Sequence, residues 1–163
     1  MEQPMSALLP SKEIYEALGE MCVRFQDVES ALKWFGVSLR GGDNAEKAHS
    51  KYYMIGFSAL IEDVRRRANQ LQPLGKWRRV VQAAEAAGRR RNELVHSTWS
   101  RYGSGGAAFR RKRLKDGSKM MLDREVVSVE MIRRFNNRLE RIFVRIITLI
   151  DNPTLDVILE ESS

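Results

Sequence analysis

Apolar residues recur at every third or fourth position over four long stretches of the chain, and this spacing predicts four amphipathic helices. The first helix is predicted to begin at the N-cap Ser11 and to stop at Gly41. Its apolar face comprises Ile14, Leu18, Met21, Phe25, Val28, Leu32, Phe35 and Leu39. The second is predicted to begin at Asp43 and Glu46, spaced as a capping box, and to end before Pro73. Its apolar face comprises Tyr53, Phe57, Leu60, Val64, Ala68 and Leu71.

The third and fourth helices are predicted over residues 76–99 and 129–151, the latter with Ser128 as its N-cap. The third helix has Val80, Ala84, Ala87, Leu94, Val95 and Thr98 on its apolar face. Gly88 interrupts this pattern and is expected either to bend the helix or to divide it. The fourth helix has Ile132, Phe135, Leu139, Ile142, Ile146 and Leu149 on its apolar face.

The helical pattern stops between these two helices, over about residues 103–127. Asp116-Gly117 lies at the centre of the segment 109–122, which predicts a hairpin with a type I′ turn. Its first arm is too charged for a core strand, so we expect either a protruding basic ribbon or a disordered loop. The fold predicted is all-α: one domain over residues 1–163, an antiparallel bundle of four long helices with this insertion and a tail at 152–163.

Composition narrows the class of protein. The chain is 43% hydrophobic, which suffices for a core, and Cys22 is its one cysteine, which excludes an intramolecular disulfide and a cysteine-based zinc site. A reducing compartment, the cytoplasm, is therefore expected. No signal peptide is recognisable, and the most apolar segment, 142–150, is too short to cross a bilayer, so no membrane association is expected.

Positive charge is concentrated in one region. Residues 65–115 hold 15 Lys or Arg and two acids, a surplus of 13, whereas the rest of the chain carries −6 against a net charge of +7. Such a segment favours binding to a polyanion, RNA above all, and the alternative is a solvated basic face.

One short motif carries candidate chemistry. His49 and His96 are the only two histidines, so neither a metal site nor a cofactor is expected, and His49 is interpreted as structural. The hexapeptide Arg91-Asn92-Glu93-Leu94-Val95-His96 resembles the defining motif of HEPN domains, an Arg, usually a polar residue, and a His four to six residues after the Arg. The resemblance implies a helical bundle and a metal-independent endoribonuclease, often of toxin–antitoxin or phage-defence systems. Because some HEPN members are non-catalytic, it also leaves open a helical RNA-binding or protein-interaction adaptor.

These residue types suit RNA cleavage by attack of the 2′-OH on the adjacent phosphate. His96 would act as general acid or base, Arg91 would stabilise charge on the phosphoryl oxygens, and Asn92 would orient the substrate or His96. The expected products are a 2′,3′-cyclic phosphate and a 5′-OH. Further RNA contacts are predicted at Arg89, Arg90, Arg110, Arg111, Lys112 and Arg113.

Helix geometry complicates this assignment, because residues five apart on an α-helix are separated by about 140° around its axis. Arg91 falls on the apolar face and His96 points nearly the opposite way, whereas Asn92 and His96 share a face. A bend near Gly88, the reach of the arginine side chain, or a symmetric dimer would each bring the motif together. The resemblance implies the homodimer, since HEPN active sites are usually composite.

Structural alternatives remain for the same residues. Arg91 could form an ion pair with Glu62 or Asp63. Trp77 and Trp99 could stack on bases, but we expect them to pack in the core or at a dimer seam. The basic arm could contact an acidic partner such as an antitoxin, and an adaptor could dock a nucleotidyltransferase.

Overall fold

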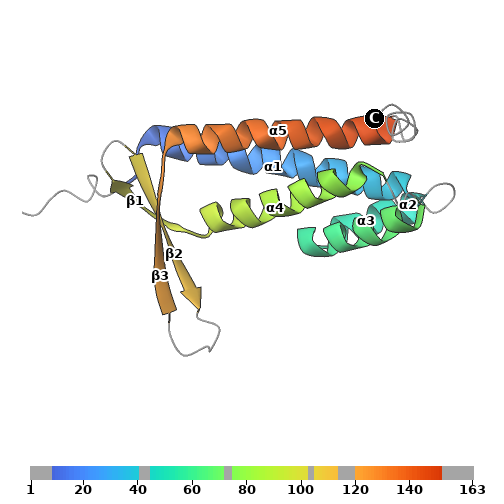
Figure 1. Ribbon diagram of the computed structural model, residues 1–163, viewed down its shortest axis with the longest axis horizontal. Coiled ribbons are helices and arrows are strands. Elements are labelled where there is room, and N and C mark those ends of the chain that lie inside the picture. Colours follow the sequence, from blue (N-terminus) through green and yellow to red (C-terminus); the bar gives the residue numbers. More distant parts are fainter. Residues whose placement is uncertain (1–8, 41–44, 72–74, 103–104, 114–119, 152–163) are drawn as a thin grey trace, which may run out of the picture. The chain divides into compact units, whose positions relative to one another are not determined.

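The computed structural model describes residues 9–40, 45–71, 75–102, 105–113 and 120–151 (Figure 1). Its helices are α1 (Lys12–Ser38), α2 (Ala45–Met54), α3 (Phe57–Leu71), α4 (Trp77–Val95) and α5 (Val129–Asp151). Its strands are β1 (Thr98–Tyr102), β2 (Gly105–Arg113) and β3 (Met120–Val127). Helices hold most of the described residues, so the predicted all-α class is confirmed. The Asp43 capping position, the Asp116-Gly117 turn and the 152–163 tail lie outside the described residues.

The chain divides into two compact units, and each combines segments that are far apart in the sequence. The sheet unit comprises Met1–Val23 and Arg89–Asn137, and the helical unit comprises Arg24–Gly88 and Arg138–Ser163. The helices α1, α4 and α5 each contribute one part to either unit. The predicted apolar faces of α1 and α5 supply much of the buried core, and α5 has its predicted bounds. Its predicted cap is also present, since Ser128 Oγ accepts a hydrogen bond from the Met131 amide.

In the helical unit, the second predicted helix is in fact two helices, α2 and α3, separated at Ile55 and Gly56. The prediction of one continuous helix was wrong because Gly56 lowers helix propensity and a tertiary contact decides the direction of α2. The ring of Tyr52 packs directly on Gly36 of α1, and a Cβ at that glycine would lie 2.7 Å from the ring. Tyr52 is therefore buried, and Tyr53, predicted on the apolar face, is 67% exposed.

The helix α4 is continuous through Gly88, which therefore does not divide it. Gly88 is buried against the ring of Phe57, and an added Cβ would overlap that ring. A glycine at this position thus allows close packing of α4 on α3. The predicted end at residue 99 was wrong, because α4 ends at Val95 and the following residues from Thr98 form β1. Val95, the last residue of α4, and Thr98 in β1 are both exposed rather than buried in the predicted apolar face.

The sheet unit contains an antiparallel sheet in the order β1-β2-β3. The strand β1 pairs with the first part of β2, from Gly105 to Phe109. Beyond Phe109, β2 is paired with β3 alone, from Arg110 opposite Asp123 to Arg113 opposite Met120. The predicted hairpin is confirmed as a two-stranded ribbon that extends past β1 (Figure 1). The strand β1 was not predicted.

Candidate functional site

The C-terminal end of α4, in the sheet unit, is held by three hydrogen bonds. The Ser97 hydroxyl donates to the Glu93 carbonyl, and the Trp99 indole Nε1 donates to the Leu94 carbonyl at 2.9 Å. The His96 amide donates to the carbonyl of Asn92 at 3.0 Å. These bonds satisfy carbonyl groups that a helix end leaves without intrahelical partners, and they define the turn that carries His96.

The motif residues lie on this end of the helix. Asn92 and His96 are exposed and one turn apart, so they share a face. Arg91 is half-buried. Its Nε atom is buried within the protein, whereas its Nη1 atom donates a hydrogen bond of 2.9 Å to Asn92 Oδ1. The Arg91 guanidinium therefore contacts Asn92, the polar side chain that shares the face of His96.

Arg90 has a structural ion pair. Its two terminal nitrogens donate to both carboxylate oxygens of Glu125 on β3, at 2.7 and 2.6 Å, and Nη1 also donates to Glu93 at 3.2 Å. The hydrogen bonds that Arg90 donates to Glu125 outweigh burial and raise the pKa of Arg90. This bidentate pair ties α4 to the sheet beside the motif. The neighbouring Arg89 has an exposed side chain.

The basic arm of the hairpin is placed by its backbone. Arg110, Arg111, Lys112 and Arg113 are consecutive residues of β2 opposite β3, and their side chains lie outside the described part of the chain. The structure thus puts these four residues on the ribbon and the motif on α4, within one compact unit.

In the helical unit, the buried carboxylate of Asp63 forms ion pairs with three arginine side chains. Asp63 accepts hydrogen bonds from Tyr52 Oη at 2.7 Å, Arg67 Nε at 2.9 Å, Arg66 Nη2 at 2.5 Å and Arg40 Nη2 at 3.2 Å. Burial by itself raises the pKa of Asp63, but the hydrogen bonds from Tyr52 and the arginines outweigh it and hold this pKa well below its usual range. The three- and four-residue spacing from Asp63 to Arg66 and Arg67 was a readable signal of pairing, whereas Arg40 and Tyr52 are distant in sequence.

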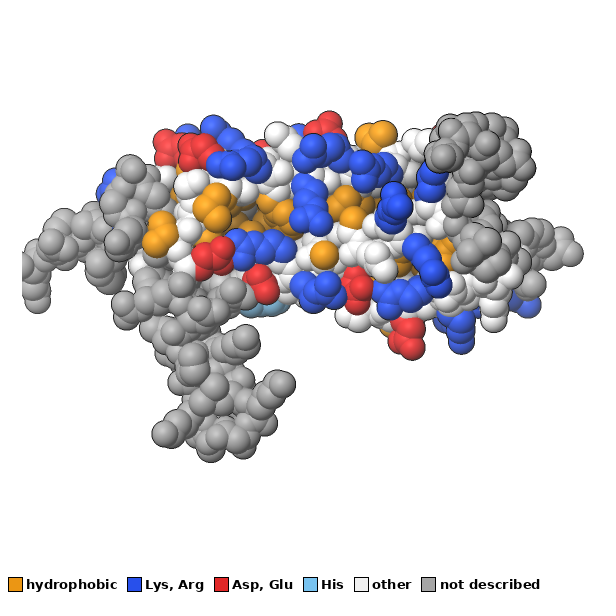
Figure 2. Space-filling model, in the orientation of Figure 1, with side chains coloured by type: hydrophobic (Ala, Val, Ile, Leu, Met, Phe, Trp, Pro, Cys, Tyr) orange, Lys and Arg blue, Asp and Glu red, His pale blue; other side chains and the backbone are white. Residues whose placement is uncertain are grey.

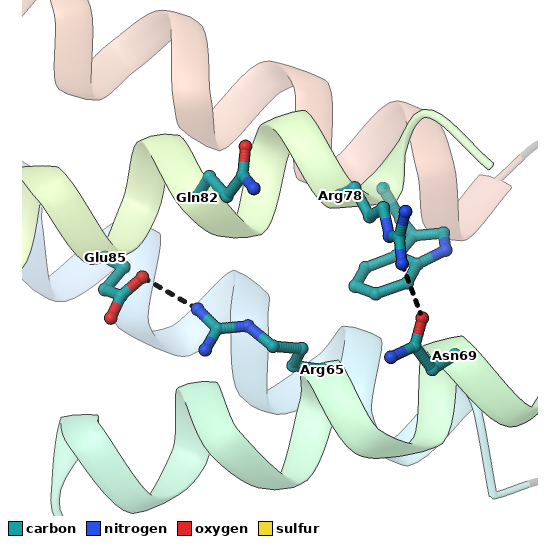
Figure 3. Close-up of a pocket in the computed structure, with 6 residues that line it drawn as sticks. Arg65, Asn69, Arg78, Gln82 and Glu85 are labelled. Carbon is teal, nitrogen blue, oxygen red and sulfur yellow. Dashed lines mark hydrogen bonds and ion pairs between the residues drawn. The ribbon is translucent and has the colours of Figure 1, made fainter. Parts of the chain in front are cut away.

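A pocket of about 440 Å³ lies between α3 and α4 in the helical unit. Arg65 and Asn69 of α3 and Arg78, Gln82 and Glu85 of α4 line it, together with Trp77 (Figure 3). Arg65 reaches across to Glu85 at 2.7 Å, and Arg78 donates to Asn69 Oδ1 at 3.4 Å. The sequence showed only that this region is basic, and no sequence motif indicates the pocket.

Trp77 and His49 both occupy structural positions. Trp77 is 1% exposed, which confirms its prediction as a core residue. His49 packs between the rings of Trp34 and Tyr53, with ring centroids 4.9 Å from each, in agreement with its structural interpretation.

On the face drawn in Figure 2, Lys and Arg side chains are interspersed with acidic and hydrophobic ones. The carboxylates of Asp63 and Glu125, which lie outside residues 65–115, pair with arginines of that segment and offset part of its surplus positive charge.

Comparisons with protein-family models, with curated proteins and with solved structures found no match to this chain. None of the described helices has the combination of length and apolar composition that a membrane span needs. Within the described residues, His, Cys, Asp and Glu side chains form no group that could hold a metal ion.

Proposed function

We propose that this chain is a metal-independent endoribonuclease of HEPN type, with Arg91, Asn92 and His96 as its active-site residues. The observation that carries the proposal is the hydrogen bond from Arg91 Nη1 to Asn92 Oδ1 on the exposed end of α4, where His96 follows one turn later. This contact supports a shared polar site, although the two ends of the motif are about 140° apart on an ideal helix.

In the proposed reaction the 2′-oxygen of RNA attacks the adjacent phosphorus, and the bond from phosphorus to the 5′-oxygen breaks. One histidine removes the 2′-OH proton and another group protonates the departing 5′-oxygen, so that protons balance. The Arg91 guanidinium donates to the phosphoryl oxygens as charge builds on them. The products are a 2′,3′-cyclic phosphate and a 5′-OH.

A homodimer would supply the second proton-transfer group, because the base and the acid act on opposite sides of the phosphorus. His96 of one copy would then serve as base and His96 of the other as acid. We expect a mass of twice 18.8 kDa by light scattering, and a monomer that still cleaves RNA would contradict the composite site.

The test of the activity is cleavage of a mixed-sequence RNA in EDTA. We expect His96→Ala and Arg91→Ala to lose at least about a hundredfold in rate, as loss of a general acid or base does. Arg79→Ala, which removes an exposed arginine near the start of the same helix where no RNA contact is predicted, is the control and should retain most of the activity. The new ends should accept phosphate from a 5′-kinase without prior phosphatase treatment. Absence of cleavage by the wild type, or equal cleavage by the His96 variant, would refute the proposal.

The second candidate function is a non-catalytic RNA-binding or protein-interaction adaptor. The β2–β3 ribbon favours it, because its backbone places four consecutive basic residues beyond the edge strand β1. Such a ribbon would bind phosphates without chemistry, and its affinity for RNA would fall steeply with salt. RNA binding by a protein that cuts nothing, lost when Arg110, Arg111 and Arg113 are all changed to Ser, would favour this candidate.

A further inference from the structure

One row of residues across the sheet holds the end of α4 at two points. Trp99 of β1 and Glu125 of β3 both lie opposite Ala108 of β2, so the three residues form a single row, which we call the Trp99–Glu125 row. The Trp99 indole donates a hydrogen bond of 2.9 Å to the Leu94 carbonyl, and Glu125 accepts two hydrogen bonds, of 2.7 and 2.6 Å, from Arg90. Because Arg90 and Leu94 are one turn apart, the row binds one side of the helix.

The motif is on the segment of α4 that this row holds. Arg91 and Asn92 lie between the two attachment points on the helix, and His96 follows the second by two residues. In β3, Val127 comes two residues after Glu125 and is 1% exposed, so this end of the strand is fixed in the core. The row therefore joins a fixed part of the sheet to the residues proposed as the active site.

The basic ribbon begins next to the same row. Arg110 follows Ala108 by two residues in β2, which is about 7 Å along an extended strand. The pairing of β1 with β2 stops at Phe109, so from Arg110 onward β2 is paired with β3 alone. The direction in which the ribbon leaves the sheet consequently depends on the Trp99–Glu125 row, where both of its strands still belong to the three-stranded sheet.

We propose that Glu125 is a positioning residue for RNA cleavage. Through Arg90 it fixes the basic ribbon relative to the motif, so that RNA bound by the ribbon meets Arg91 and His96 in the orientation for cleavage. This role rests on the proposed function. Glu125 itself does not contact RNA, because its charge repels phosphate and both of its oxygens accept hydrogen bonds from Arg90. Its contribution is to orientation, and a displacement of about 1 Å at a reacting centre can cost about a hundredfold in rate.

Catalytic rate and RNA binding should separate in the variants. Glu125→Gln keeps the size of the side chain but removes the charge that holds Arg90, and should lower kcat for RNA cleavage in EDTA by at least about tenfold. KM should change by less than about twofold, since the basic residues of the ribbon are intact. The ribbon variant in which Arg110, Arg111 and Arg113 are all changed to Ser should show the opposite split, with a raised KM.

A double-mutant cycle tests whether the effect passes through Arg90. Arg90→Gln should reproduce the loss in kcat, and the double variant should lose no more than either single one, because each breaks the same pair. Arg90→Lys keeps the charge but cannot form two parallel hydrogen bonds, so it should retain only part of the rate. Glu16→Gln is the control and should cleave as wild type does, because it also breaks an ion pair of the sheet unit, with Lys12 at 3.2 Å, but that pair lies within α1.

Circular dichroism at the assay temperature checks that each variant is folded, and RNA affinity is measured separately in the His96→Ala background, where nothing is cut. If Glu125→Gln does not fold, Arg90→Lys is the milder variant, and a wild-type kcat for it overturns the proposed role of Glu125.

Three results for a folded Glu125→Gln protein would also overturn that role: a kcat within about twofold of the Glu16→Gln control, a loss that appears in KM rather than in kcat, or a double variant whose loss is the product of the two single losses. These results leave the proposed function intact. Absence of cleavage by the wild type would instead refute the proposed function and the role of Glu125 together.

Discussion

The carboxylate of Asp63 holds together three segments of the helical unit, from the end of α1 to α2 and α3. Its side chain is 8% exposed, and its partners Arg40 and Arg67 are 17% and 26% exposed, whereas Arg66 is 62% exposed. Asp63→Asn keeps the shape but removes the charge that these arginines face. Breaking a buried pair costs roughly 3–5 kcal/mol and an exposed pair about 0–1 kcal/mol. With two partners mostly buried and one exposed, we expect a loss of about 3 kcal/mol in the free energy of unfolding.

Urea unfolding at pH 7, followed by circular dichroism at the helix band, measures this loss. A change of 1 kcal/mol moves the melting temperature of a chain of this size by about 2–4 °C, so a fall of roughly 6–12 °C should accompany it. Glu62→Gln, at the adjacent exposed position, is the control and should stay within about 0.5 kcal/mol of wild type. An Asp63→Asn variant that is as stable as this control would refute the reasoning.

The difference in unfolding free energy between wild type and Asp63→Asn should depend on pH. The pKa of Asp63 is lowered in the folded protein, whereas in the unfolded chain it is near the ordinary aspartate pKa of about 3.9. The carboxylate therefore contributes its full stability above the unfolded value, and this contribution is lost as the pH falls toward the folded value. We expect the stability difference between wild type and Asp63→Asn to be constant from pH 7 to pH 5 and to shrink below pH 4. A difference that widens on acidification would contradict the direction of the shift.

Two other substitutions test contacts that only the fold creates. Gly36→Ala places a Cβ 2.7 Å from the ring of Tyr52, and the overpacking cost of about 1–3 kcal/mol should exceed the gain of up to about 1 kcal/mol in helix propensity. Its urea midpoint should fall, and a higher midpoint would show that the ring moves aside freely. Glu125→Gln removes the bidentate partner of Arg90, whose side chain is 28% exposed, and should cost about 1 kcal/mol in unfolding monitored by tryptophan fluorescence. No change there would mean that the pair does not join α4 to the sheet.

Local sequence patterns were sufficient to predict the parts of the fold that depend on interactions between nearby residues. The apolar face of α1 follows from its spacing, because a helix buries one face whatever it packs against. The start of α5 could be predicted from Ser128, because a cap bonds only to the next few residues. The β2–β3 hairpin could be predicted from Asp116-Gly117, since the turn residues of a hairpin select its two arms.

Tertiary contacts decided the rest. The periodicity that joined α2 to α3 continued across Gly56, but the helix breaks there, and the packing of Tyr52 on Gly36 decides the direction of α2. Thr98 and Trp99 fit a helical pattern, but pairing with β2 stabilises them as part of a strand, because strand hydrogen bonds depend on a partner distant in sequence.

The candidate site divides in the same way. The sequence by itself determined which residues form the motif, from Arg91 to His96, and that Asn92 and His96 share a helix face. Only the tertiary structure decided that Arg90 is bound by Glu125, 35 residues away in the sequence. Helix periodicity determines the direction in which a side chain leaves the backbone, whereas the position of a long arginine's guanidinium depends on which neighbours the fold brings within hydrogen-bonding distance.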